Sequence, residues 1–144
     1  MAGVELIQEL LAAISGVATD TFVGLLLDVM KLGLEHSPDY HGNIEDFKGS
    51  YVFRTADDRV CKAAIFDQGG MEISDTAPEE WDARVTFATV PAFQKFLFSG
   101  DQDILNSLLA NEVEVDGNLN YIYKFGFMAR ELQLRPWDIF VEGR

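Results

Sequence analysis

The feature that most restricts the fold is a series of four strand-like runs between residues 49 and 88. The runs are GSYVFRT, RVCKAAIFD, GMEISDT and DARVTFA, and turn-forming sequences join them: ADD, DQGG and the longer APEEW. Connections this short favour antiparallel neighbours, so the runs predict a meander. Alternation in the fourth run places Val85 and Phe87 opposite Arg84 and Thr86, which gives the sheet one apolar face.

A long apolar helical segment precedes the sheet. Residues Val4 to Leu34 have helical character with a break near Ser15 to Asp20, and Pro38 and Gly42 mark a loop after them. The second piece of this segment is apolar around most of its circumference, whereas a surface helix usually has a single apolar stripe. We therefore expect it to be covered on two sides.

Two short helices follow the sheet. Thr89 is suited to cap the first of them, and Pro91 fits its first turn, where a missing amide proton costs nothing. Gly100 ends that helix, and Asp101 caps the next one, which covers Gln102 to Leu109. Neither helix contains a group suited to catalysis.

The chain closes with a strand and a longer helix. EVEVDGN predicts a short edge strand, Asn118 is expected to cap the final helix, and that helix ends near Leu134, before Pro136. Its apolar residues fall on several faces, so this helix also needs two partners. The faces are Tyr121, Phe125, Met128 and Leu132; Leu119, Ile122, Gly126 and Ala129; and Tyr123 with Phe127.

The chain is strongly acidic, with a formal net charge of −13. Residues 67–118 alone hold eleven acidic residues and two basic ones. Such a surface repels phosphate backbones, so we expect no nucleic-acid partner. The acidity serves to keep an apolar protein in solution.

The sequence also bears on location. Cys61 is the only cysteine, which excludes an intramolecular disulfide, and its place among small strand residues suggests a core thiol. The first basic residue is Lys31, so the N-terminus lacks the positive region of a signal peptide. The uncharged run Leu10 to Thr19 is too short to cross a bilayer. A cytoplasmic protein without stable membrane insertion is expected.

Motifs that carry chemistry are missing from the sequence. It has no nucleophile elbow, no P-loop and no dinucleotide fingerprint, and the glycines of DQGG precede a strand, as in a hairpin turn. His36 and His41 lie near Asp39, but their spacing matches no zinc signature, so a structural or surface role is favoured. We expect no catalytic residue, no metal, no cofactor and hence no enzyme.

The order of these elements resembles the sterol carrier protein 2 (SCP2) domain family. The matching segments are YVFRTADDRVCKAAIFDQGGMEI, ARVTFATVPAFQKFLFSGDQDILNSLLANEVEVDGN and YIYKFGFMAREL, and they cover roughly residues 44–134. Two features depart from the family pattern: Asn111 and Glu112 stand where a Gly-Lys pair is common, and the peroxisomal C-terminal signal is missing.

The resemblance implies an α+β fold in which helices cover one face of a five-stranded, mostly antiparallel sheet. It further implies an apolar tunnel between the layers and a non-enzymatic carrier that sequesters a sterol, a fatty acyl chain or another apolar ligand. The side chains expected to line the tunnel are Phe66, Ile73, Phe87, Phe93, Phe96, Leu97, Leu105, Leu108, Leu109, Ile122, Phe125 and Met128.

The expected organisation is one domain over residues 1–144. Helices occupy residues 1–36, the SCP2-like body residues 44–134, and a C-terminal tail residues 135–144. The alternative function is a non-catalytic dimerisation or accessory module that docks on a partner protein, or that forms a homodimer through its N-terminal helices. A hydrolase using His36 or His41 is a third class, and it is the least supported by the sequence.

Overall fold

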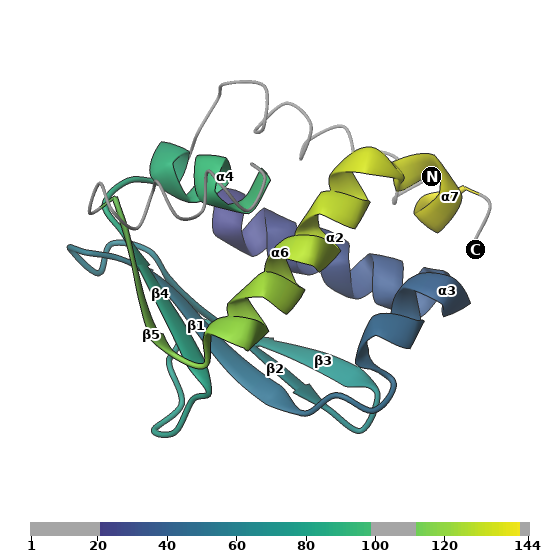
Figure 1. Cartoon of the computed structure of the whole chain (residues 1–144), viewed down its shortest axis with the longest axis horizontal. Helices are drawn as coiled ribbons and strands as arrows, with labels where there is room; N and C mark the ends of the chain where they lie inside the picture. Colours follow the sequence, from purple (N-terminus) through teal and green to yellow (C-terminus); the bar gives the residue numbers. More distant parts are fainter. Residues whose placement is uncertain (1–20, 99–111, 142–144) are drawn as a thin grey trace.

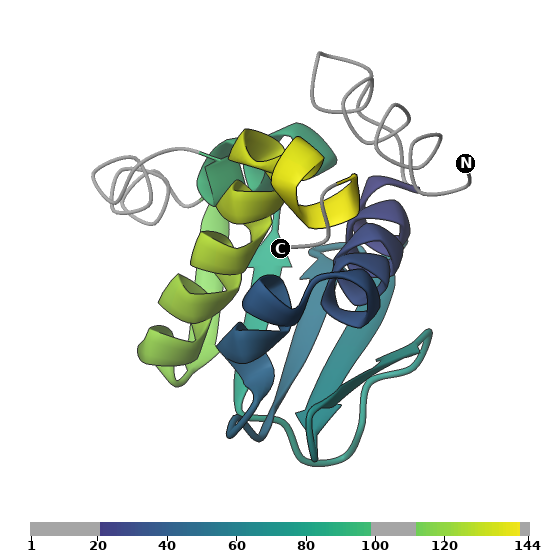
Figure 2. The same ribbon diagram turned by 90° about the vertical axis from the view of Figure 1, so that its right-hand side faces the viewer.

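The computed structural model of the chain describes residues 21–98 and 112–141. Within these ranges the protein is an α+β structure: the helices lie on one face of a five-stranded sheet, and the sheet does not close on itself (Figure 1). In the view turned by 90° the helices lie in front of the sheet (Figure 2). The predicted fold class is confirmed.

The strands lie where alternation predicts them. They are β1 (Gly49–Thr55), β2 (Cys61–Asp67), β3 (Gly70–Ser74), β4 (Ala83–Phe87) and β5 (Val113–Gly117), in the spatial order β3-β2-β1-β4-β5. Three of the four pairings are antiparallel, while β1 and β4 are parallel. The sheet is therefore mostly antiparallel, as expected, with β5 at an edge.

The predicted meander is wrong at its fourth strand, because β4 pairs with β1 and not with β3. Eight residues carry the chain from the edge strand β3 to the other side of β1. There the backbone amide of Asp82 donates a hydrogen bond to the carbonyl oxygen of Ser50, at 2.9 Å. β4 thus starts beside the start of β1, and the β2–β3 hairpin serves as the long connection that parallel strands require.

Helix α2 (Phe22–His36) packs against β2 and β3 on one side and against α3 (Pro38–His41), α6 (Leu119–Leu134) and α7 (Pro136–Phe140) on others, and eight of its residues are buried. Gly33 allows this packing: a Cβ at this position would lie 3.1 Å from Ile139 and 3.2 Å from Tyr40, in two neighbouring helices. α2 therefore has apolar partners on two sides, as its sequence predicts.

The loop predicted at Pro38 and Gly42 is wrong, because this segment forms α3 (Pro38–His41) and the 3₁₀ turn η1 (Gly42–Ile44). The Ser37 hydroxyl accepts a hydrogen bond from the backbone amide of Tyr40, at 3.1 Å. Pro38 occupies the first helical position, where proline is favoured. A serine cap followed by proline thus starts a helix of one turn.

The C-terminal half contains α4 (Val90–Phe98), α6 (Leu119–Leu134) and α7 (Pro136–Phe140). Two of the predicted caps are confirmed: the Thr89 hydroxyl accepts from the amide of Ala92 at 3.2 Å, and the Asn118 side chain accepts from the amide of Asn120 at 3.0 Å. The helix predicted at residues 102–109 lies outside the described residues.

The two faces of the sheet differ as the alternation predicts. The helix-covered face carries buried Tyr51, Phe53, Phe66 and Phe87, while polar side chains pair across the other face. There the Nε of Arg54 donates to the Thr86 hydroxyl at 3.1 Å, and Arg84 forms an ion pair with Asp116 at 3.0 Å. Cys61 begins β2 opposite Arg54 and is half-buried, so its assignment as a core thiol was wrong.

Candidate functional site

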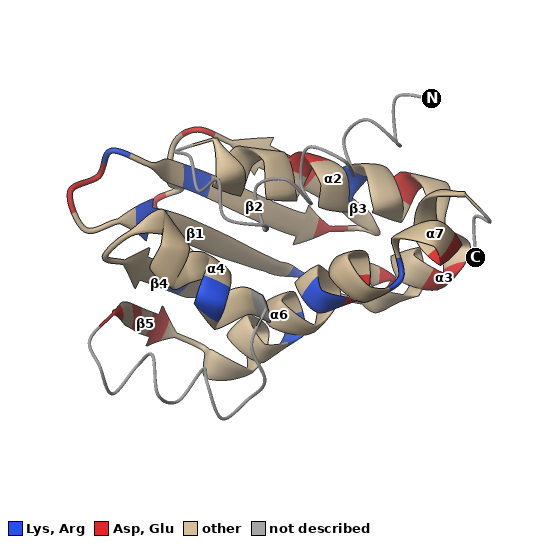
Figure 3. Ribbon diagram, turned by 90° about the horizontal axis from the view of Figure 1, so that it is seen from above, with Lys and Arg blue, Asp and Glu red and all other residues tan. Residues whose placement is uncertain are grey.

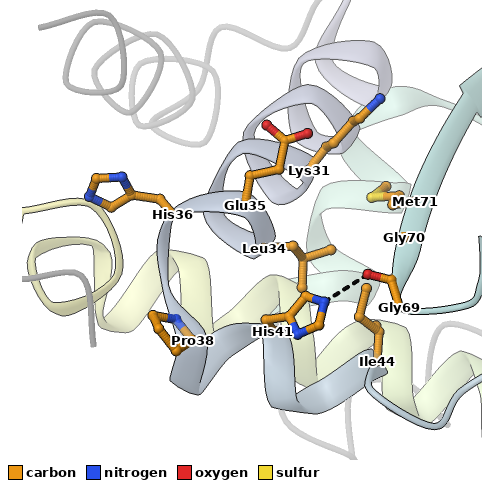
Figure 4. Close-up of a pocket in the computed structure, with 10 residues that line it drawn as sticks. All are labelled: Lys31, Leu34, Glu35, His36, Pro38, His41, Ile44, Gly69, Gly70 and Met71. Carbon is orange, nitrogen blue, oxygen red and sulfur yellow. Dashed lines mark hydrogen bonds between the residues drawn. The ribbon is translucent and has the colours of Figure 1, made fainter.

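A cavity of about 500 Å³ lies between the C-terminal end of α2, the short helix α3 and the β2–β3 turn (Figure 4). We refer to it as the His41 cavity. Its wall combines apolar side chains, four ionisable side chains and two glycines of the turn. The lining residues are Lys31, Leu34, Glu35, His36, Pro38, His41, Ile44, Gly69, Gly70 and Met71.

The inner part of the His41 cavity is apolar. Leu34, Ile44 and Met71 are each at most 6% exposed, and they come from α2, η1 and β3. Glu35 and His36 are exposed, and the His36 side chain points away from the centre of the group (Figure 4). The cavity therefore has an apolar floor and a polar rim, the combination typical of small-molecule sites.

A hydrogen bond fixes the wall formed by His41. The Nε2 of His41 lies 2.7 Å from the carbonyl oxygen of Gly69. Because a carbonyl can only accept, this ring nitrogen carries the hydrogen. Gln68 and Gly69 both have positive φ, 52° and 74°, as a two-residue type I′ hairpin turn requires. The turn predicted from DQGG is confirmed, and it presents its carbonyl to the histidine.

A buried tyrosine supports the cavity from behind. Tyr40 is 1% exposed, and its hydroxyl donates to the carbonyl oxygen of Met128 in α6, at 2.8 Å. Burial raises the pKa of Tyr40 well above its ordinary value, and the nearby Glu131 carboxylate raises it further. Tyr40 is therefore a neutral donor that holds α3, and with it His41, against α6.

The apolar floor of the cavity continues into the core as a connected row of aromatic rings. Met71 pairs with Phe66 across β2 and β3, and Phe66 meets Tyr51 edge-on, with centroids 5.7 Å apart. From Tyr51 the row passes to Phe125 at 5.4 Å, Phe53 at 4.6 Å, Phe93 at 5.5 Å and Phe87 at 4.4 Å. We refer to these six rings as the aromatic row. It runs from the His41 cavity to the layer beneath α4.

Nine of the residues predicted to line a tunnel fall within the described ranges, and they belong to the core between the sheet and the helices or pack against it. All but one of those within the described ranges are buried, and Ile73 packs against the core while half-buried. The buried ones are Phe66, Phe87, Phe93, Phe96, Leu97, Ile122, Phe125 and Met128. Leu105, Leu108 and Leu109 lie outside the described residues. None of the predicted residues lines the His41 cavity, so the position of the cavity was missed.

Within residues 21–98 and 112–141, no group of three or more His, Cys, Asp or Glu side chains is placed to hold a metal ion. In the same ranges, no helix combines the length and the apolar character that crossing a bilayer needs.

Comparison with known proteins identifies the fold. No model of a known protein family matches the sequence, and no curated protein matches it. Among solved structures, the ubiquinone synthesis protein UbiJ-SCP2 superposes with a TM-score of 0.56 at 14% identity, covering 71% of this chain and 87% of that one. Sterol carrier protein 2 from Yarrowia lipolytica, in its apo form, superposes with a TM-score of 0.54 at 16% identity, covering 77% and 91%.

A part of an enzyme shares this architecture. The sec-alkylsulfatase Pisa1 from Pseudomonas sp. superposes with a TM-score of 0.54 at 14% identity over 72% of this chain, but over only 16% of the sulfatase. The same fold therefore occurs as a whole small protein and as a segment of a longer chain, and the fold does not decide between the two uses.

The fold and the cavity define a class: a one-sided α+β sandwich with an apolar interior. More specifically, the chain has the SCP2-like fold, as the resemblance predicted.

Proposed function

We propose that this protein binds a lipid-like molecule, an apolar chain with a small polar head, without transforming it chemically. The observation that carries the proposal is the continuity between the His41 cavity and the aromatic row through the paired residues Met71 and Phe66. The solved SCP2 proteins that share the fold support it.

In this proposal the polar head of the ligand stays at the rim, near Lys31 and His41, where water and hydrogen-bonding groups are available. The apolar chain of the ligand enters past Leu34, Ile44 and Met71 and lies along the predicted lining residues of the interior. The rings of the aromatic row contact one another in this structure, so they have to move apart when the apolar chain of the ligand enters. Leu105, Leu108 and Leu109 remain proposed contacts.

The affinity should be moderate. Drug-sized ligands gain about 0.3 kcal/mol per heavy atom, so a sixteen-carbon fatty acid of about eighteen heavy atoms gains about 5 to 6 kcal/mol. This free energy corresponds to a dissociation constant of tens to hundreds of micromolar. Each methylene adds little discrimination, so chains of neighbouring length should bind similarly.

The setting we propose is the cytoplasm, with the protein acting as a carrier. Its net charge of −13 opposes binding to nucleic acid and to strongly anionic surfaces. The contacts within the aromatic row are those of a filled interior, as the alternative of a docking module expects, whereas the solved SCP2 proteins of the same fold support a carrier.

Titration with a fluorescent sixteen-carbon fatty acid, together with native mass spectrometry of the purified protein, tests the proposal. The variants Ile44→Trp and Met71→Trp fill the His41 cavity, and we expect each to weaken uptake by about tenfold or more. Glu45→Trp is the matched control, because Glu45 adjoins Ile44 but is exposed and does not line the cavity. Its affinity should equal that of the wild type.

Overpacking at Ile44 or Met71 is expected to cost about 1 to 3 kcal/mol, so thermal unfolding has to show that each variant remains folded. The proposal fails if the wild type takes up no fatty acid, fatty alcohol or sterol. It also fails if folded Ile44→Trp and Met71→Trp bind as tightly as Glu45→Trp.

A further inference from the structure

The exposed side of α6 carries a row of large apolar side chains. Leu119 and Tyr123 are each 40% exposed, Phe127 is 51% exposed and Leu134 is 75% exposed. Their spacings of four, four and seven residues keep them on one side of the helix. α6 lies at the outside of the helical layer in two perpendicular views (Figures 1 and 2). Contiguous apolar surface of this kind marks an interaction site more often than scattered single residues do.

One basic residue belongs to the same side. With about 100° between successive residues, Arg130 and the four apolar residues fall within an arc of about 80°. Gly126, next to this side, is buried, and a Cβ on it would lie 3.6 Å from Nη1 of Arg130, so the guanidinium covers the glycine. We call this set the α6 stripe: Leu119, Tyr123, Phe127, Arg130 and Leu134.

We propose that the α6 stripe is the interface between two copies of this chain, in which the two α6 helices pack antiparallel about a twofold axis. The axis passes midway between Gly126 and Phe127. Because the two helices are antiparallel, a residue that lies a given number of positions before this axis faces the residue of the second copy that lies the same number of positions after it. In a twofold interface every such contact occurs twice.

This register makes the stripe complementary to itself. Leu119 faces Leu134 of the second copy, and Tyr123 faces Arg130, a pair suited to a cation–π contact. Phe127 is exposed and lies beside the axis, so the Phe127 rings of the two copies come next to each other, an arrangement suited to an aromatic pair. Beside the stripe, Asn120 faces Gln133. Each large side chain of the stripe thus meets a partner of matching chemistry or size.

Charge favours a second copy over a bilayer as the occupant. The α6 stripe holds no acidic residue, its single base faces a tyrosine, and Lys124 beside it lies over the ring of Phe47 in its own copy, 4.9 Å from the centroid. The bases of α6 are well separated along the helix (Figure 3). Binding to an anionic membrane needs a cluster of bases, which the α6 stripe lacks.

The interface leaves the His41 cavity open. The cavity is built from α2, α3, η1 and the β2–β3 turn, and no residue of the α6 stripe lines it. The dimer therefore does not depend on the proposed ligand binding, and either inference can fail alone.

Disulfide cross-linking tests the register directly. In a Cys61→Ser background the protein has no other cysteine, so Leu119→Cys and Leu134→Cys each introduce a single thiol. In the antiparallel pair, residue 119 lies next to residue 134 of the second copy. It is about 22 Å from residue 119 of that copy, which is far beyond disulfide reach. Under mild oxidation, the mixture of the two variants should give a covalent dimer that neither variant forms alone.

Sedimentation velocity over a wide range of protein concentration tests the association itself. The wild type should show a monomer–dimer equilibrium, and Phe127→Asp should raise its dissociation constant about tenfold or more. Val141→Asp is the matched control, because it places the same charge at an exposed apolar residue of the C-terminal turn, outside α6, and should leave the equilibrium unchanged. Circular dichroism checks that both variants are folded.

Three results would overturn the proposal. The first is a wild type that stays monomeric at every concentration. The second is cross-linking of either single variant as efficient as that of the mixture. The third is a monomeric wild type whose binding to anionic phosphatidylserine vesicles is lost in Phe127→Asp, which would make the stripe a membrane-binding surface.

Discussion

One carboxylate oxygen of Asp82 accepts hydrogen bonds from both the backbone amide and the side-chain hydroxyl of Ser50, at 2.8 and 3.3 Å. The backbone amide of Asp82 returns a hydrogen bond to the carbonyl oxygen of Ser50. These contacts join the start of β1 to the residue before β4. They therefore fix which strand becomes the neighbour of β1.

Replacing Asp82 by alanine removes two of these three hydrogen bonds. The group is exposed, so we expect a loss of about 0.5 to 1.5 kcal/mol in the free energy of unfolding, measured by urea denaturation. Glu80→Ala, in the same connection, is the control and should change stability by less than about 0.5 kcal/mol. Equal effects of the two substitutions would show that the carboxylate of Asp82 does not hold the strands together.

Gly117 is required by its backbone conformation and by its surroundings. Its φ is +90°, and a Cβ at this position would overlap the carbonyl oxygen of Asp82. We expect Gly117→Ala to destabilise the protein by about 2 to 4 kcal/mol, since strain and a backbone clash act together.

Gly42→Ala is the matched comparison for Gly117→Ala, because a Cβ there has nothing within 4 Å. It should leave the midpoint of thermal unfolding almost unchanged. A Gly117→Ala variant that unfolds at the same temperature as Gly42→Ala would contradict the positive φ of Gly117 and its close approach to the Asp82 carbonyl.

Local signals in the sequence account for the parts of the fold that could be predicted. Alternation located β1 to β4, and short-range capping chemistry located the starts of α4 and α6 at Thr89 and Asn118. Each of these features depends on residues within about four positions of one another.

The parts that could not be predicted depend on contacts between distant residues. Nothing near β4 in the sequence states that Asp82 will meet Ser50, so the meander was the natural expectation and the parallel pairing was missed. The His41 cavity was missed for the same reason, since it joins His41 to Gly69 across 28 positions. Which residues lie in the interior was easier to predict, because an apolar residue on the covered face of a strand or helix is usually buried.

The bond between His41 and Gly69 should contribute to stability, whereas His36 should not. His41→Phe removes a donor and leaves the Gly69 carbonyl without this partner, so we expect a loss of about 1 kcal/mol in the free energy of unfolding. His36→Phe makes the same chemical change at an exposed residue five positions earlier, and should stay within about 0.5 kcal/mol of the wild type. Urea denaturation of both variants decides the matter. Equal stabilities would show that the hydrogen bond does not brace the cavity wall.

Stability at alkaline pH should report on the two buried tyrosines. Burial is the main cause that raises the pKa of both Tyr40 and Tyr51 above the ordinary value of 10.0. Below that value both hydroxyls are protonated in the folded and unfolded states, so they give no pH dependence. Above it the unfolded chain releases protons that the folded protein retains, and stability falls as the pH rises.

Each tyrosine should then lower the free energy of unfolding by up to about 1.4 kcal/mol per pH unit above pH 10. Tyr40→Phe removes one of the two contributions. Above pH 10 the free energy of unfolding of this variant should therefore fall with pH about half as steeply as that of the wild type. It also lacks the hydrogen bond to Met128, so at neutral pH it should be less stable by about 1 kcal/mol. Tyr123→Phe, at an exposed position, should keep the full wild-type slope. Urea denaturation at several pH values between 8 and 11 measures these slopes, and an unchanged slope in Tyr40→Phe would mean that Tyr40 ionises as freely in the folded protein as in the unfolded chain.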